Sequence, residues 1–266
     1  TSTIGRIGYQ EGSAGTVTVA GEGSQWKNSR SLFVGRSGEG TLNIEDGGVV
    51  TSTIGRIGYQ EGSAGSVTVA GEGSQWNNAE DLWVGNTGEG TLHIEAGGLV
   101  SNSTGFIGND SDSMGIVTVT GEGSEWNTSD DLQVGSRGSG TLNIASGGTV
   151  RVEGITWVAK EAGSSGAINF ENGTLATGGL VSSLSNLRGT GTISTHGLVS
   201  DIDLVFAGQS DLTQSFRLED AGRDVTIDLE VNGTGSIGVG YDDTASLQIT
   251  GGANVESVAG YLGYQT

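Results

Sequence analysis

Three tryptophans recur in phase along this 266-residue chain and are the most regular candidates for binding chemistry. Trp26, Trp76 and Trp126 lie 50 residues apart, each after a Gly-x-Gly-Ser motif. Aromatic rings offer a large apolar face, so an exposed ladder of indoles would suit stacking on sugars. The alternative is that each ring covers a corner of a repeated core beside its glycine turn. Both interpretations stay open from the sequence.

Asp110 and Asp112 form the best local cluster of carboxylates for a metal ion. Ca²⁺ prefers oxygen ligands, and these residues have the two-residue spacing of a calcium loop. The rest of that loop pattern is missing, and so is the Gly-Gly-x-Gly-x-Asp calcium repeat. Calcium is therefore the one cofactor we consider. The alternative is solvated negative charge that keeps the protein soluble.

Asp201 and Asp203 lie in the only group of residues that could form the catalytic site of an enzyme. They lie two residues apart on an expected strand, so both carboxylates would face one side. Arg188 and His196 are nearby in sequence. Polysaccharide hydrolysis needs such a clustered carboxylate set. An Asp-x-Asp pair on a strand is usually simply exposed, and regular repeats indicate selection on shape, so we expect no enzyme.

The elements that must position these residues are set by an internal repeat. Residues 1–50, 51–100 and 101–150 are three copies of one 50-residue unit, and the first two copies differ at only 11 positions. Such a period is typical of solenoids, propellers and arrays. Each unit has two similar halves, each beginning with an apolar residue before a turn. These anchors are Ile7, Val34, Ile57, Val84, Ile107, Val134 and Val158, at spacings of 27, 23, 27, 23, 27 and 24 residues.

Alternation within the strands assigns their faces. In the stretch 16–19, Val17 and Val19 point one way and the threonines the other. These valines should stack on the apolar pairs of the following half-units, which are Leu42 and Ile44, Val67 and Val69, Leu92 and Ile94, Val117 and Val119, and Leu142 and Ile144. The outward ladder would contain Thr18, Asn43, Thr68, His93, Thr118, Asn143 and Asn169. Its mixture of side chains argues against the regular threonine array of an ice-binding surface.

The predicted fold class is therefore all-β, a single-stranded right-handed parallel β-helix of about ten coils. Residues 1–150 form six regular coils, 151–245 continue the solenoid irregularly, and 246–266 begin a further regular repeat. A separate β-domain in the irregular part is the alternative. Zero Pro among 266 residues fits strands that must all donate N–H groups to the next coil.

Both ends of the chain carry the repeat pattern. Thr1 starts in mid-repeat, so we expect a segment of something longer. The stretch from Leu247 to Gln265 resembles the stretch from Leu42 to Gln60. Uncapped solenoid ends present unpaired strand edges, which favours axial self-association. The residues expected at these ends are Thr3, Ile4, Ile7, Leu247, Ile249, Val255 and Leu262.

Composition restricts which binding partners and which cellular compartment we expect for this chain. The formal net charge of −20 argues against nucleic acid and against anionic membrane surfaces. No apolar stretch approaches the length of a membrane span, and no signal peptide is recognised. The absence of Cys fits a bacterial surface protein without proving the compartment.

The sequence resembles the repeat shared by autotransporter (type V secretion) passenger proteins and PEP-CTERM surface proteins. The matching motifs are Val34-Gly35…Gly40-Thr41-Leu42-Asn43-Ile44…Gly47-Gly48-x-Val50 and Gly21-x-Gly23-Ser24-x-Trp26. They cover residues 1–170 and 240–266. The resemblance implies a bacterial extracellular or cell-surface β-helix, with structural or adhesive roles, and offers no catalytic residues to transfer.

We therefore expect an extracellular structural module, a rigid stalk or filament segment that stacks head to tail in a surface adhesin or fibre. The alternative is a carbohydrate-binding adhesin that holds surface glycans on the Trp26, Trp76 and Trp126 face.

Overall fold

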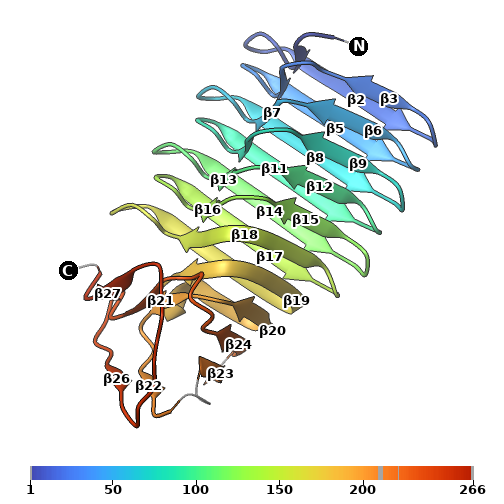
Figure 1. Ribbon diagram of the computed structural model, residues 1–266. Coiled ribbons are helices and arrows are strands. Elements are labelled where there is room, and N and C mark those ends of the chain that lie inside the picture. Colours follow the sequence, from blue (N-terminus) through green and yellow to red (C-terminus); the bar gives the residue numbers. More distant parts are fainter. Residues whose placement is uncertain (1, 209–211, 221, 265–266) are drawn as a thin grey trace.

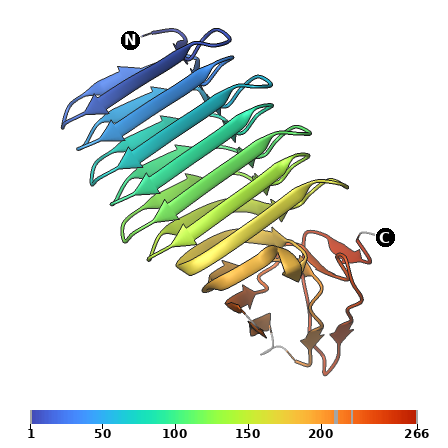
Figure 2. The same cartoon turned by 180° about the vertical axis from the view of Figure 1, so that it is seen from behind.

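Parallel strands stack coil upon coil along one axis, and the predicted β-solenoid is confirmed, with about ten turns of about 25 residues. The structure is a computed structural model that describes residues 2–208, 212–220 and 222–264. One 25-stranded sheet contains nearly all of the strands. Figures 1 and 2 show the coils from two sides, with the N-terminal coil at one end and an irregular lobe at the other.

The regular coils each contribute one strand to three ladders, here named A, B and C. Ladder A contains β1 (Gly5–Ile7), β4 (Ser31–Val34), β7 (Ile54–Ile57), β10 (Leu82–Val84), β13 (Gly105–Ile107) and β16 (Leu132–Val134). Ladder B contains β2 (Ala14–Ala20), β5 (Glu39–Glu45), β8 (Ala64–Ala70), β11 (Glu89–Glu95), β14 (Met114–Thr120) and β17 (Ser139–Ala145). Ladder C contains β3 (Gln25–Lys27), β6 (Val49–Ser52), β9 (Gln75–Asn78), β12 (Leu99–Asn102) and β15 (Glu125–Thr128).

The register follows the apolar alternation of the sequence. Val17 pairs with Leu42 and Val19 with Ile44, and the same columns continue coil by coil to β17. In ladder A, Ile7 pairs with Val34, and the later anchors follow in line to Val158. From Leu42 onward, the inward Val, Leu and Ile side chains of ladder B are 0% exposed up to β17. Each such burial contributes about 1.5–3 kcal/mol, and the predicted stacking is confirmed.

Two glycines show why the turns between ladders A and B exclude other residues. Gly8 has a φ of +62°, and a Cβ there would lie 2.2 Å from the carbonyl oxygen of Glu39. Gly40 has no positive φ, but its Cβ would lie 2.1 Å from the backbone nitrogen of Gly35. The first position needs a left-handed backbone, and both positions bring two backbones closer than a side chain allows.

Longer strands replace the regular pattern after residue 148. β18 (Thr149–Val158) runs through ladders C and A, and β19 (Ser165–Val181) runs through all three. β20 (Leu187–Thr195) pairs with β19, and the short 3-10 helix η1 (Leu184–Asn186) lies between them. Register shifts mark the corners within these long strands, where the chain passes from one ladder to the next without leaving the strand.

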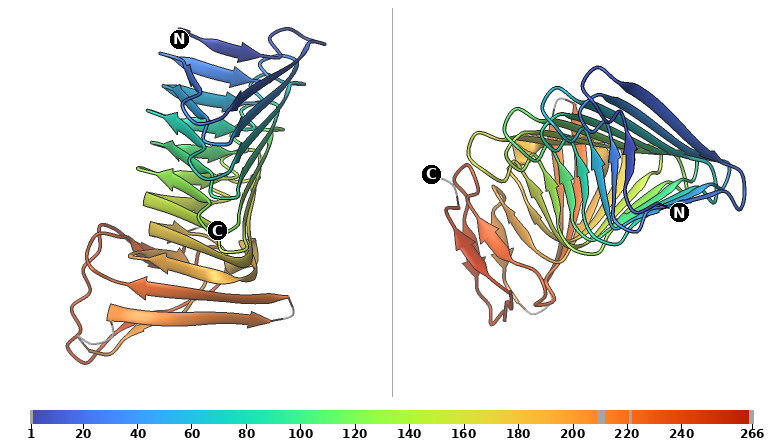
Figure 3. Two further views of the ribbon diagram at one scale, coloured as in Figure 1. Left: turned by 90° about the vertical axis from the view of Figure 1, so that its right-hand side faces the viewer. Right: turned by 90° about the horizontal axis from the view of Figure 1, so that it is seen from above.

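An irregular lobe follows these coils. Ladder A continues through β21 (Leu198–Ser200), β25 (Ile237–Val239) and β27 (Gly260–Leu262). β22 (Leu204–Phe206) and β26 (Leu247–Ile249) form a separate parallel pair. β24 (Arg223–Glu230) adds to β20 in parallel, but β23 (Thr213–Asp220) pairs with β24 in antiparallel fashion. The hairpin β23–β24 lies at the base of the stack, drawn in orange in Figure 3. This reversal was not anticipated from the sequence.

The last coil repeats the backbone of an interior coil. Gly251 and Gly252 have φ angles of 61° and 77°, close to the 53° and 85° of Asp46 and Gly47. The backbone N–H of Ala253 donates to Thr250 O at 3.0 Å, as Gly48 N–H does to Glu45 O. The interior copies of this coil are covered by the next coil, whereas Leu262 here is 75% exposed. Thr1 and residues 265–266 of the predicted repeats lie outside the described residues.

Candidate functional site

The three in-phase tryptophans line the interior of ladder C. Trp76 and Trp126 are 0% exposed, and Trp26, in the first coil, packs partly buried against the core. A ring with no accessible face cannot stack on a sugar, so the prediction of a glycan-binding Trp ladder is wrong. The physical reason is the alternation of ladder C, which turns Trp76 and Val50 to the same inward column.

The N–H group of each buried indole donates a hydrogen bond to a polar side chain of the preceding coil. Trp76 Nε1 donates to Ser52 Oγ at 3.3 Å, and Trp126 Nε1 donates to Asn102 Oδ1 at 2.6 Å. Ser52 Oγ also donates to Asn78 Oδ1 at 2.6 Å. Buried donors of this kind need a partner. The interior end of ladder C is therefore a polar column that joins successive coils.

Of the two predicted calcium residues, Asp110 has another partner. Asp110 forms an ion pair of 2.6 Å with Arg137 in the next coil, and Asp112 occupies a turn position with a φ of 66°. Among the residues that the structure describes, no group of three or more His, Cys, Asp or Glu side chains could hold a metal ion. A calcium site at Asp110 and Asp112 stays a prediction.

The Asp201 and Asp203 carboxylates tie two segments of the lobe together. Asp201 Oδ1 accepts backbone N–H bonds from Asp242 and Asp243 at 2.8 and 2.9 Å. Asp203 Oδ1 accepts from the backbone N–H and hydroxyl of Ser246 at 2.6 and 2.9 Å, and these bonds hold the pKa of Asp203 below its ordinary value. Both carboxylates therefore serve as acceptors for a loop, an arrangement that organises the lobe.

A different aromatic ladder lies on the outside of ladder A, and the sequence reading missed it. The residue before each anchor faces outward and pairs in register with its neighbours. These outward positions are Arg6, Phe33, Arg56, Trp83, Phe106, Gln133 and Trp157. The signal was readable, because the same position in every coil is either aromatic (Phe33, Trp83, Phe106, Trp157) or a long polar or cationic residue (Arg6, Arg56, Gln133). We call this set the aromatic–cationic ladder.

Arg56 sits at the centre of the aromatic–cationic ladder. Its guanidinium lies 4.7 Å from the ring centroid of Trp83, 5.3 Å from that of Phe33 and 5.5 Å from that of Tyr59. Burial lowers the pKa of Arg56, while the nearby Tyr59 and Asp81 oppose that change. Such contacts contribute about 0.5–2 kcal/mol each. The Phe33 and Trp83 rings are partly buried and both pack against Arg56, so this ladder is a packed outer seam.

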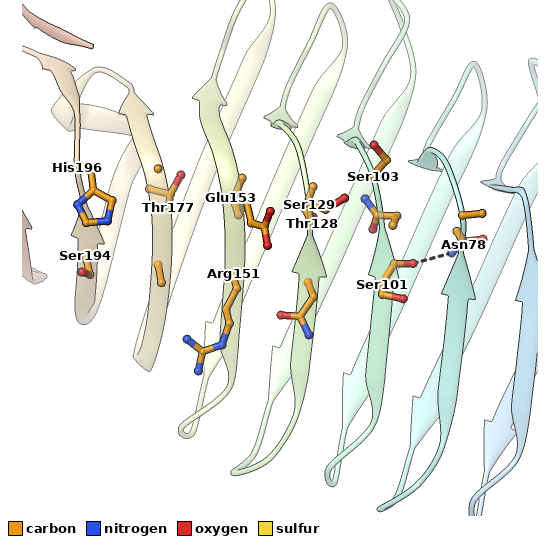
Figure 4. A pocket seen from close by; sticks show the side chains of 16 residues that line it. Asn78, Ser101, Ser103, Thr128, Ser129, Arg151, Glu153, Thr177, Ser194 and His196 are labelled. Atoms are coloured by element: carbon orange, nitrogen blue, oxygen red, sulfur yellow. Dashed lines mark hydrogen bonds between the residues drawn. The ribbon is translucent and has the colours of Figure 1, made fainter. Parts of the chain in front are cut away.

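A polar groove is a further feature of the surface, and Figure 4 shows it at close range. It occupies about 620 Å³ and crosses β9, β12, β15, β18, β19 and β20 at the corner between ladders C and A. Each coil presents side chains from the end of its C strand, mostly Ser, Thr and Asn. Arg151, Glu153 and His196 are its charged or titratable members, and Arg151 forms an ion pair with Glu125.

The groove follows from the geometry of the corner. The buried residues Asn78, Asn102 and Thr128 end successive C strands, and the chain turns toward ladder A directly after them. Stacked coils place equivalent side chains about 4.8 Å apart along the axis. A surface of this kind can offer the same hydrogen-bonding groups repeatedly to a long polar ligand.

Comparison with known proteins gives no assignment, since no family model, no curated protein and no solved structure matches the chain. In the described part of the chain, no helix is long and apolar enough to cross a membrane.

Proposed function

We propose that this chain is a non-enzymatic structural module, a stiff β-solenoid rod that serves as a stalk or filament segment at a bacterial cell surface. The observation that carries the proposal is the unbroken in-register pairing of ladders A and B through the regular coils. Each coil after the first is bonded to both neighbours there, so bending or stretching the rod strains the bonds between its coils. The large negative charge limits lateral clumping of such rods.

The extracellular surface is proposed from composition and repeat pattern. Because the chain has no Cys, it has no thiol that an oxidising environment could modify. Its net charge of −20 favours solubility. The repeat motifs resemble those of autotransporter passenger and PEP-CTERM surface proteins. An adhesive or fibrous surface protein is the setting in which a rod of this kind would act.

The axial partner is proposed to be a further coil, from a second copy or from adjoining chain. Ile249 and Leu262 are 49% and 75% exposed, although their counterparts Ile44 and Ile57 are 0% exposed. Val17 in the first coil is only partly buried, whereas the equivalent Val67 is fully buried. The hairpin β23–β24 covers the end of the β20 ladder. The contact would therefore form on the β26–β27 side of the lobe.

Electron microscopy of the purified chain tests this proposal. We expect rods joined end to end, and we expect Leu262→Asp to shorten them. Val258→Asp is the matched control, because Val258 is 72% exposed but corresponds to the outward Thr53 of an interior coil. Strictly single short rods in the unsubstituted protein, or equal shortening by both variants, would contradict axial association through this face.

A further inference from the structure

We propose that the axial partner of this chain is a second copy, and that Arg6, Tyr9 and Arg36 of one copy dock into an acidic hollow in the irregular lobe of the other. The inference rests on the axial association proposed above and names its partner and its chemistry. It is carried by cations that have no ion pair, by a hollow of matching chemistry, and by the position of both at one corner of the solenoid.

Three residues, here named the cationic patch, lie on and just after the first two strands of ladder A. The Tyr9 ring is 49% exposed, and the guanidinium groups of Arg6 and Arg36 lie 5.3 and 4.9 Å from its centroid. In the part of the chain that the structure describes, neither arginine forms an ion pair, whereas Arg137 and Arg151 each pair with a carboxylate. The patch therefore offers two unneutralised cations beside an open aromatic face, and carboxylates would complement it.

The acidic hollow lies beside the last coil and has a volume of about 470 Å³. Leu247 and Leu262 contribute apolar side chains to its lining, and Leu262 is 75% exposed. Asp242 and Asp243, both exposed, contribute carboxylates to the same lining. An apolar surface next to two carboxylates is the chemical complement of an aromatic ring flanked by two guanidinium groups.

The cationic patch and the acidic hollow lie at the same corner of the solenoid, at opposite ends of the stack. One unbroken column of in-register pairs in ladder A runs from Arg6, coil by coil, to Tyr261. Tyr9 follows the first member of this column by three residues, and Leu262 directly follows the last. Figure 1 shows β27 and the N-terminal coil at the two ends of the stack. A second copy stacked along this axis therefore presents its patch on the side where the hollow lies.

The distribution of charge along the chain favours the same polarity of contact. Residues 1–60 contain five Lys and Arg and five Asp and Glu, so their formal net charge is zero. Residues 201–266 contain two Arg and eleven Asp and Glu, so their formal net charge is −9. Two lobes would therefore repel each other, whereas the first coils of one copy meet the lobe of another without that repulsion. Charge thus selects head-to-tail contact over tail-to-tail contact.

A second copy is the partner that supplies both halves of this contact. The cationic patch needs a carboxylate-bearing surface, and the acidic hollow needs a cationic one, and this chain carries each of them. A contact between two different faces of the same molecule leaves a free patch at one end and a free hollow at the other. It can therefore repeat from copy to copy and lengthen the rod.

Sedimentation velocity over a concentration series, with electron microscopy of the same samples, tests the inference. We expect Arg36→Glu and Asp242→Lys each to weaken association roughly fivefold, because each change turns an attractive contact into a repulsive one. Arg30→Glu is the matched control, since it makes the same change of charge outside the patch and the second repeat carries Glu80 at the equivalent position. It should alter association by less than about twofold.

Two further variants separate the contact from folding. Arg36→Asn copies Asn86, the equivalent residue of the second repeat, so it should fold like the unsubstituted protein and still weaken association roughly threefold. The double variant Arg36→Glu with Asp242→Lys exchanges the two charges, so association should return to within about twofold of the unsubstituted protein. Association that stays weak in the double variant would overturn the inference, and so would equal weakening by Arg30→Glu.

The outcomes also distinguish this inference from the axial association on which it rests. Rods that join end to end equally well in Arg36→Glu, Asp242→Lys and the unsubstituted protein would overturn the docking and leave axial association standing. Strictly single short rods in the unsubstituted protein would contradict both. A response to Arg36→Glu without a response to Asp242→Lys would place a different acidic surface against the patch and overturn the assignment of the hollow.

Discussion

Trp126 Nε1 donates a 2.6 Å hydrogen bond to Asn102 Oδ1 in the preceding coil, and both side chains are buried. This bond joins two coils through the core, where no water competes for either group. It also explains how a solenoid of Val, Leu and Ile tolerates a large indole at one position in every second coil.

Replacing Trp126 by Phe should lower the free energy of unfolding by about 2–4 kcal/mol. The change leaves Asn102 Oδ1 unpaired and removes buried ring atoms. Chemical denaturation measures the effect. Trp26→Phe is the matched control, because Trp26 in the first coil is only partly buried, and its loss should cost less. Equal losses in the two variants would mean that the inter-coil bond adds nothing to stability.

Gly90→Ala should destabilise the protein by at least about 3 kcal/mol, because the added Cβ would lie 2.1 Å from the backbone nitrogen of Gly85. Gly62→Ala is the comparison. Gly62 has a φ of +72° but no atom within 4 Å of its added Cβ, so only backbone strain of about 1–2 kcal/mol is expected. Thermal unfolding of both variants shows which one loses more stability. A larger loss in Gly62→Ala than in Gly90→Ala would contradict the close approach of the two backbones at Gly90.

Arg56→Met should cost about 1–2 kcal/mol of stability, because the cation over Phe33, Tyr59 and Trp83 is lost while the aliphatic stem is largely kept. Arg6→Met should cost under about 0.5 kcal/mol, since Arg6 is exposed and contacts one ring, that of Tyr9. Urea denaturation followed by tryptophan fluorescence measures both. Similar small losses would show that the aromatic–cationic ladder is energetically inert.

The Tyr241 phenol should lose its proton at an unusually high pH. Burial, and then the charge of Asp242, raise its pKa to about 12, and its hydroxyl donates to Ala159 O at 3.1 Å. The unfolded chain loses this proton near pH 10 while the folded chain keeps it, so the contribution to stability is full below about pH 10 and is lost as pH rises toward 12. Ultraviolet titration of the protein and of Tyr241→Phe isolates this phenol. A pKa near 10 would contradict its burial.

The sequence alone was sufficient to predict the stacking of the coils and the register of their strand pairing. The pairing of Val17 with Leu42 follows from period-2 alternation and the fixed repeat, because only one register buries every apolar side chain. The orientation of Trp76 needed more information, since a Trp between two polar residues can face either way until the corner geometry is known. In the structure it shares a column with Val50 and turns inward.

Other features depended on contacts between coils that no single repeat contains. The antiparallel pairing of β23 with β24 arises where the repeat signal is absent. The unpaired buried atoms of Asn102 and Thr128 depend on which neighbouring groups in the core already have hydrogen-bond partners. The outward ladder around Arg56 was readable in the sequence, but only once the anchors fixed its face.

Stretching single molecules along the solenoid axis tests the central claim most directly, since a stalk must bear load coil by coil. Because each coil is bonded mainly to the coils next to it, coils should detach one at a time and give a series of rupture peaks in the force. Each peak should release one coil of about 25 residues, roughly 8–9 nm of extended chain. Extension without rupture peaks, or one rupture that releases the whole chain at once, would contradict a rod built from stacked, separately bonded coils.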